Sequence, residues 1–280
     1  MSKSKNPQIS VFMSIYREKI EIVSKAVESI LNQTYKNFEL IIVLDSPEYK
    51  EMIDFIKSLE KKDKRIFFYV NKKNLGDAYS KNFSINKSKG KYIAIMDCDD
   101  IALKNRFEKQ IKFMRENKDC DLCYGNVIHI NKNDKIQRNY NLQKNLFNKL
   151  YKKVLGSYMI PHPTVFAKRK IFNNIKYDIK FRKAKDFDVL LRLNKKFKFM
   201  KINEVLVKYR VSDSKDLENR FRKAKNSTKW SSKALLKNYK LYWYNLYYNL
   251  MLIDSILKIF ILTVIPKKIL IKILKNKKNL

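Results

Sequence analysis

The chain has 280 residues, of which 45% are hydrophobic and 13% aromatic, and its formal net charge is +35 at pH 7. This apolar content excludes a disordered chain, and the length suits one large domain with an appendage. The charge would also fit nucleic-acid binding, but most of the excess is lysine, so we expect a solvated basic surface that attracts anionic lipid or nucleotide diphosphates and no specific nucleic-acid site.

The first 130 residues alternate between strand and helix patterns. Apolar runs predict strands near residues 9–16, 38–45, 65–71, 92–100 and 121–130. Helical spacing predicts helices near residues 20–31, 48–61, 77–88 and 105–117. Later segments predict a return to the sheet at 161–166, a helix at 185–197 and a strand at 201–211. Such alternation predicts an α/β fold, a Rossmann-like and mainly parallel sheet with right-handed crossovers.

The N-terminus and the cysteines favour a cytoplasmic protein. "MSKSKNPQ" lacks the apolar stretch of a signal peptide, so we expect neither export nor an N-terminal anchor. Cys98, Cys120 and Cys123 are odd in number, which favours reduced thiols. Cys120 and Cys123 do form a C-x-x-C pattern. It lies in an apolar run without a second Cys or His pair, so we expect no zinc or redox site there.

Acidic residues follow two of the predicted strands. Asp45 ends the second, and Asp97, Asp99 and Asp100 end the fourth, while Gly76 permits a turn after the third. Because open α/β sheets bind ligands beyond the carboxyl ends of their strands, we expect these ends to converge on one crevice.

The acidic group at the end of the fourth strand suits a divalent cation. Residues two apart in an extended strand share a face, which would place Asp97 and Asp99 together. Their repulsion would be relieved by Mn²⁺ or Mg²⁺, which also leaves ligand positions for phosphate oxygens. Two alternatives stay open: Asp100 caps the next helix, or the acids end a strand without binding metal.

Four segments in this order and spacing resemble family 2 glycosyltransferases of the GT-A fold: "SILNQTYKNFELIIVLD", "NLGDAYSKNFSINKSKGKYIAIMDCDD", "NRFEKQIKFM" and "AKDFDVLLRL". The resemblance covers about residues 8 to 212 and looks like the bacterial members that build lipopolysaccharide or capsule. It implies an inverting transferase that moves a sugar from a nucleotide-diphosphate donor, a UDP-sugar, to a hydroxyl of a glycan or lipid-linked acceptor.

On the donor side the resemblance implies roles for single residues. Asp45 matches the aspartate that recognises the nucleotide base, although Leu44-Asp45-Ser46-Pro47 replaces the usual Asp-Asp-Gly-Ser. Asp97 and Asp99 match the D-x-D motif, with Asp99 as the metal ligand and Asp97 nearer the ribose. The remaining matches on the nucleotide side are Tyr16, Gly76, and the pair Lys81 and Asn82. Tyr16 is kept although Ser14-Ile15-Tyr16 stands where the family commonly has Pro-Thr-Tyr.

On the acceptor side, Asp186 matches the second residue of the Glu-Asp motif, the general base, with Lys185 in place of the Glu. The alternative is that Asp186 and Asp188 only stabilise the start of a helix. His162 matches a His-Pro that the family places near the acceptor, and Asp188 is a second candidate there. For His162 a purely structural role is the alternative.

The C-terminal segment differs in character, so we divide the chain into a catalytic domain of residues 1–214 and a basic, aromatic-rich helical extension of residues 215–280. Residues 221–280 carry fourteen Lys and Arg against one acid, Asp254. Because Asp254 and Lys258 interrupt its apolar run, we expect a helix that lies in the interface of an anionic membrane rather than one that spans it, ended by Pro266. The protein would then lie peripherally at the inner face of the cytoplasmic membrane. A helical lid or a dimer interface are the alternatives.

Two other function classes compete with the enzyme. One is a catalytically degenerate, transferase-like scaffold at the membrane or on nucleic acid. The other is a nucleotidyltransferase, which usually needs a glycine-rich phosphate loop that four glycines do not provide. Acidic residues at all four motif positions, Asp45, Asp97, Asp99 and Asp186, favour the enzyme over the scaffold.

Overall fold

A computed structural model describes residues 7–137, 150, 153–154, 160–211 and 217–264. The chain divides into two compact units, which we describe separately. The first comprises residues 1–139, 160–180 and 196–211, and the second comprises residues 140–159, 181–195 and 212–280. Residues 181–195 fall within the predicted catalytic domain 1–214, yet in the structure they group with the C-terminal helices.

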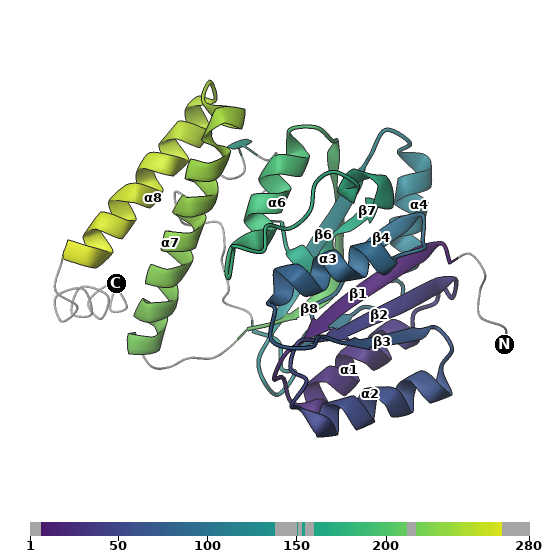
Figure 1. The fold of residues 1–280 in the computed structure, drawn as a ribbon. Helices are drawn as coiled ribbons and strands as arrows, with labels where there is room; N and C mark the ends of the chain where they lie inside the picture. The colour runs from purple at the N-terminus through teal and green to yellow at the C-terminus, as the bar shows by residue number, and fades with distance from the viewer. Residues whose placement is uncertain (1–6, 138–149, 151–152, 155–159, 212–216, 265–280) are drawn as a thin grey trace. The chain divides into compact units, whose positions relative to one another are not determined.

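The first unit is built on one eight-stranded sheet (Figure 1). Its strands are β1 (Ile9–Ile15), β2 (Phe38–Leu44), β3 (Ile66–Val70), β4 (Tyr92–Ile95), β5 (Ile101–Ala102), β6 (Leu122–Ile130), β7 (Phe166–Lys168) and β8 (Phe199–Arg210). They are ordered β3-β2-β1-β4-β7-β6-β8-β5. The pairs β1–β2, β2–β3, β1–β4 and β6–β8 are parallel, while β7 and β5 run antiparallel to their neighbours. The predicted α/β fold with a mainly parallel sheet is confirmed.

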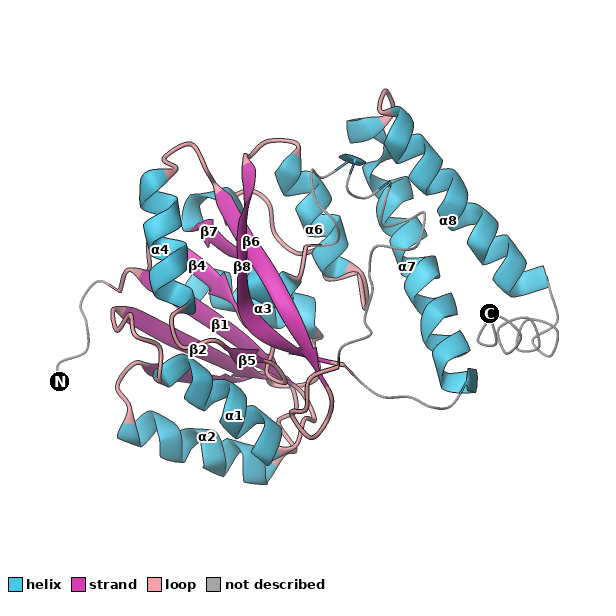
Figure 2. Ribbon diagram, turned by 180° about the vertical axis from the view of Figure 1, so that it is seen from behind, coloured by secondary structure: helices cyan, strands magenta, loops and turns pink. Residues whose placement is uncertain are grey.

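Helices cover both faces of this sheet. They are α1 (Ile20–Leu31), α2 (Lys50–Lys62), α3 (Asp77–Lys87) and α4 (Arg106–Glu116), and short 3₁₀ turns, η2 (His162–Thr164) and η3 (Arg169–Phe172), flank β7. Figure 1 shows α3 in front of the sheet, and Figure 2 shows α1 and α4 in front when the molecule is seen from behind. With both faces covered, β2 is buried over its whole length, which explains why all its residues except Glu39 are apolar.

The fourth strand is shorter than the sequence pattern predicts. β4 ends at Ile95, and the next acids form a turn in which the Asp100 N–H donates to the Asp97 carbonyl at 3.3 Å. Asp97 and Asp99 therefore do not belong to a strand, and the prediction that they share one face of a strand is wrong. Asp100 is also no helix cap, since α4 begins at Arg106 and Asp100 Oδ1 instead accepts the Arg210 N–H at 2.7 Å.

The described part of the second unit contains the helices α6 (Lys185–Asn194), α7 (Leu217–Tyr242) and α8 (Leu246–Val264). The hydroxyls of Ser232 and Ser255 join α7 to α8 at 2.5 Å, and the Tyr242 and Tyr248 rings stack with centroids 4.7 Å apart. The predicted helical extension is confirmed, while Pro266 lies outside the described residues. Although Asp254 and Lys258 interrupt it, α8 is the one helix in the described part that is long and apolar enough to cross a membrane.

Candidate active site

The turn after β4 gathers three carboxyl groups in partly and fully buried positions. Burial raises the pKa of Asp99 to about 6, with further contributions from the negative charges of Asp97 and Glu18. Burial also raises the pKa of Asp100 to about 9, again helped by Asp97 and Asp99. Carboxyl groups that raise one another's pKa lie within electrostatic reach, so the turn attracts a cation.

Arg210, at the end of β8, fixes the backbone of this acidic turn. Its N–H holds Asp100, its Nε donates to the Asp99 carbonyl at 2.7 Å, and its Nη1 donates to the Asn131 carbonyl at 2.8 Å. These bonds position the turn with one residue that is more than a hundred positions away in sequence. No local sequence pattern marks Arg210 for this role.

Lys81 on α3 brings a buried positive charge to the same place. Its Nζ lies 2.8 Å from Asp77 Oδ2 and 3.7 Å from Asp97 Oδ1, and the Ser14 hydroxyl donates to Asp77. Burial alone would lower the pKa of Lys81, but the Asp77 and Asp97 carboxylates together raise it above its ordinary value. The ammonium is therefore charged at neutral pH. The structure thus joins Lys81 to the acidic turn through Asp97.

Asp45 holds the loop that leads into α3. Its Oδ1 accepts bonds from the Asn71 amide at 2.7 Å and the Leu75 N–H at 2.8 Å, and its Oδ2 accepts the Gly76 N–H at 2.7 Å. Gly76 has φ +90°, so the expectation that this turn needs glycine is confirmed. Because Asp45 is buried and accepts three bonds, it shapes this loop, and its contact with a nucleotide base stays a prediction.

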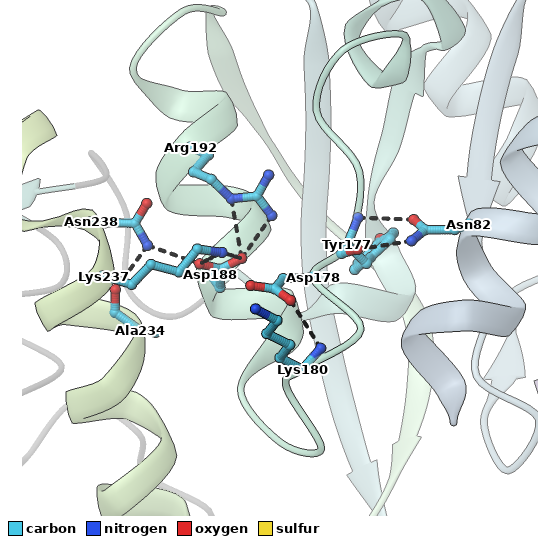
Figure 3. Close-up of polar contacts among 9 residues, drawn as sticks. All are labelled: Asn82, Tyr177, Asp178, Lys180, Asp188, Arg192, Ala234, Lys237 and Asn238. Atoms are coloured by element: carbon cyan, nitrogen blue, oxygen red, sulfur yellow. Dashed lines mark hydrogen bonds and ion pairs between the residues drawn. The ribbon is translucent and has the colours of Figure 1, made fainter. Parts of the chain in front are cut away.

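Asn82, Tyr177 and His162 form a second polar group in the first unit. The Asn82 amide donates to the Tyr177 carbonyl at 2.8 Å and accepts the Tyr177 N–H at 2.9 Å (Figure 3). The Tyr177 hydroxyl in turn lies 2.9 Å from His162 Nε2, and His162 is buried. Both hydrogen-bonding groups of Asn82 are thus used within the protein. The geometry agrees with the structural alternative for His162, while the nucleotide and acceptor contacts stay predictions.

Tyr16 differs from these residues because it is exposed at the carboxyl end of β1. Its side chain is 39% exposed, and the Arg17 guanidinium lies 5.1 Å from the ring centroid. The Tyr16 N–H donates to the Glu18 carboxylate at 2.8 Å. An exposed aromatic ring at a strand end suits stacking on a planar ligand.

The two acids at the start of α6, in the second unit, have different environments. Asp186 is half-buried, and its side chain makes no hydrogen bond or ion pair with any other described residue. Asp188 is completely buried and bound by Arg192, Lys237 and Asn238 (Figure 3). In this conformation Asp188 has no exposed surface with which to meet an acceptor, whereas Asp186 has free carboxylate oxygens among the described groups.

Comparison with known proteins identifies the family. The model of glycosyl transferase family 2 matches residues 10–176. The chain belongs to this family. Its match begins in β1 and ends before Tyr177, so it includes Asp45, Lys81, Asn82 and the acidic turn but not α6.

Family 2 relatives match most of the chain. An uncharacterized glycosyltransferase of Methanocaldococcus jannaschii is 37% identical over 98% of this chain and 95% of its own length. An Escherichia coli protein named UDP-Glc:alpha-D-GlcNAc-diphosphoundecaprenol beta-1,3-glucosyltransferase WfgD is 30% identical over 78% of this chain and 82% of its own. The crystal structure of S. aureus TarS 1-349 in complex with UDP has a TM-score of 0.59 at 15% identity, covering 82% of this chain and 65% of that one. This last likeness supports the GT-A fold.

Within this family 2 fold, sequence motifs found the acidic turn and Lys81 but missed the residues that hold them. Asp77 could have been found, because an acid four residues before Lys81 on a helix pairs with it. Glu18, Tyr177 and Arg210 act through tertiary contacts that have no local pattern.

Proposed function

We propose that this family 2 glycosyltransferase moves a sugar from a UDP-linked donor to a hydroxyl of a glycan or lipid-linked acceptor, with inversion, during the synthesis of a lipopolysaccharide, capsule or similar surface glycan. The observation that carries the proposal is the acidic turn after β4 with the charged Lys81 beside it. A cation-attracting turn next to a buried ammonium suits a diphosphate. The relatives support the donor and acceptor classes, since the name of one includes UDP-Glc and a diphosphoundecaprenol sugar and the structure of another contains UDP.

The donor atoms of the turn fit Mn²⁺ or Mg²⁺. Asp97 and Asp99 offer hard carboxylate oxygens. Burial and then the negative charges of Asp97 and Glu18 raise the pKa of Asp99, and a bound cation would offset those charges. Among the described residues no three His, Cys, Asp or Glu side chains already form a metal site. Proteins often hold Mg²⁺ through one or two carboxylates together with substrate phosphates. When bound, such an ion stabilises the negative charge of the departing nucleoside diphosphate.

The protein's own groups account for the remaining steps. Lys81 adds a fixed positive charge on the diphosphate side, and the exposed Tyr16 ring is the surface on which the nucleotide base would stack. Asp186 is the proposed general base that takes the proton of the acceptor hydroxyl, which supplies about 10² to 10⁴ in rate. The hydroxyl oxygen then attacks the anomeric carbon opposite the leaving diphosphate. An α-linked donor would therefore give a β-glycoside.

We also propose that the helical extension contacts anionic lipid at the inner face of the cytoplasmic membrane. One face of α8 is apolar and exposed, and its residues recur every three or four positions: Leu246, Leu250, Ile253, Leu257, Phe260 and Val264. The opposite face packs inward with Tyr248 and Met251. The sixteen residues after α8 contain six lysines and no acid, which complements anionic headgroups, and Trp243 and Tyr244 precede it.

Calorimetric titration with UDP, with and without Mn²⁺, tests the donor side of the proposal. Wild-type protein should bind UDP more tightly with Mn²⁺, and Asp99→Ala should lose that difference, whereas an unchanged metal response would remove Asp99 as the ligand. Release of UDP from UDP-glucose and UDP-N-acetylglucosamine tests turnover, first in the wild type and then in Asp186→Asn. The Asp186→Asn protein should still bind UDP but lose turnover by about 10²-fold or more. Binding of UDP without any turnover in the wild type would favour the scaffold alternative.

A further inference from the structure

Among the acids of the second unit whose burial the structure describes, Asp188 is the most completely buried, and the proposed reaction does not use it. Its Oδ2 accepts two bonds from Arg192, from Nε at 3.1 Å and from Nη2 at 2.7 Å. Its Oδ1 accepts the Asn238 amide at 2.9 Å and lies 3.0 Å from the Lys237 ammonium. Arg192 lies on α6, one turn further along, whereas Lys237 and Asn238 lie on α7 (Figure 3). One carboxylate therefore joins the two helices.

Further contacts tie the segment around Asp186 to the same helix. Before α6, the centroid of the Phe181 ring lies 5.7 Å from the centroid of the Trp230 ring of α7. Near the end of α6, the Leu191 carbonyl accepts the Tyr242 hydroxyl at 2.7 Å. Asp186 lies between the first of these contacts and Asp188, so α7 holds the chain on both sides of it.

The start of α6 needs such support because its backbone is strained. Ala184, the residue before the helix, has φ +53°, a left-handed conformation that residues other than Gly, Asn and Asp rarely adopt. The Asp188 N–H donates to the Ala184 carbonyl at 2.9 Å, so Asp188 also closes the first turn from its backbone. A strained entry persists only where surrounding contacts fix it.

We propose that Asp188 is a positioning residue, through which α7 holds the first turn of α6 and with it the carboxylate of Asp186. The inference rests on the proposed function for the role of Asp186. It makes α7 a necessary part of the catalytic apparatus rather than an appended membrane-binding helix. A carboxylate suits the task because two cations and an amide converge on it, and burial strengthens these bonds.

The test compares Asp188→Asn and Asn238→Leu with the control Ser232→Ala in the full-length protein. Ser232 is also buried on α7, but it bonds to Ser255 of α8, so its loss loosens α7 from α8 and not from α6. Three quantities are measured on each variant. They are hydrogen exchange of peptides covering residues 181–190, UDP affinity, and the rate of UDP release from the UDP-sugar that the wild type uses faster.

Asp188→Asn and Asn238→Leu should speed exchange at residues 181–190 and lower kcat by about 10- to 100-fold while UDP affinity stays within about twofold, because a small misplacement of a reacting group is costly. Ser232→Ala should change neither the exchange at residues 181–190 nor kcat. If Asp186→Asn abolishes turnover while Asp188→Asn and Asn238→Leu retain normal kcat, the positioning role is overturned and the proposed function stands. If the wild type releases no UDP, the proposed function fails, and exchange alone decides whether Asp188 holds α6, with unchanged exchange overturning the inference.

Discussion

At the scale of single residues, burial rather than motif membership separates the acids of the site. Asp99 and Asp100 have raised pKa values because burial penalises their charged forms. Asp188 is more deeply buried than Asp99 and differs from it in forming ion pairs with two cations, Arg192 and Lys237. A D-x-D pattern reports only that carboxylates are close in sequence. Their roles depend on partners that come from distant segments.

The raised pKa of Asp99 predicts how stability depends on pH when metal is chelated. An acid whose folded pKa exceeds its unfolded value of 3.8 keeps a proton that the unfolded chain has released, so its contribution to stability falls as pH rises through about 6. Asp99→Asn cannot ionise. The variant should match the wild type near pH 4 and be more stable by about 1 to 3 kcal/mol at pH 8. Urea unfolding in the presence of EDTA measures this difference.

Asp63→Asn is the matched control, with the opposite sign. The hydrogen bond from Arg65 is the main cause that lowers the pKa of Asp63, so its charged form stabilises the fold above the unfolded pKa. Asp63→Asn should therefore be less stable than the wild type at pH 8 and lose this difference as the solution becomes acidic. If Asp99→Asn is destabilised at pH 8 in the same experiment, burial does not govern Asp99.

At the scale of helices and strands, periodicity located the elements well and their ends less well. Helix α1 occupies its predicted range because Val23, Val27 and Ile30 repeat at helical spacing. The end of β4 was misjudged because Met96 is as apolar as the strand before it, so hydropathy alone does not mark the turn. The grouping of α6 with α7 was not predictable, since Asp188 and Asn238 meet only in the folded chain.

The entry to α6 gives a prediction about the backbone. Because Ala184 has φ +53°, replacing it by glycine removes the steric cost of a Cβ in a left-handed conformation. Ala184→Gly should raise the stability of the protein by about 0.5 to 1 kcal/mol, although glycine usually destabilises a chain. Thermal unfolding followed by circular dichroism measures the change.

The control for this substitution is Ala26→Gly within α1, where the backbone is helical and the side chain is buried. That variant should lose about 1 kcal/mol or more. A loss of similar size at Ala184 would contradict the left-handed conformation.

At the scale of the whole molecule, the contacts of Asp188 change how the extension can be studied. Deleting the residues after 214 would remove the apolar face of α8. It would also remove Lys237 and Asn238, the α7 residues that bind Asp188 of α6. A loss of activity or of membrane binding in the truncated protein would then not distinguish the loss of the α6 contacts from the loss of the α8 face. Substitutions confined to the outer face of α8 separate them, because that face lies opposite the residues that pack inward.

The proposed membrane contact predicts the behaviour of the double variant Leu257→Glu and Phe260→Glu in the full-length protein. Both side chains are more than half exposed on the outer face of α8, so the substitutions leave the packed face of the helix unchanged. Two carboxylates there oppose both burial in lipid and attraction to anionic headgroups. Flotation with vesicles of phosphatidylglycerol and phosphatidylethanolamine should carry the wild type upward and leave the double variant behind.

Ile136→Glu with Ile179→Glu is the matched control, because these two isoleucines are equally exposed but belong to the first unit. This control adds the same negative charge to the protein and should float as the wild type does. If both double variants stay behind, flotation depends on net charge alone and not on the face of α8. If both float, and the wild type also elutes as a dimer that only the α8 variant disrupts, the apolar face covers a second copy of the chain instead of lipid.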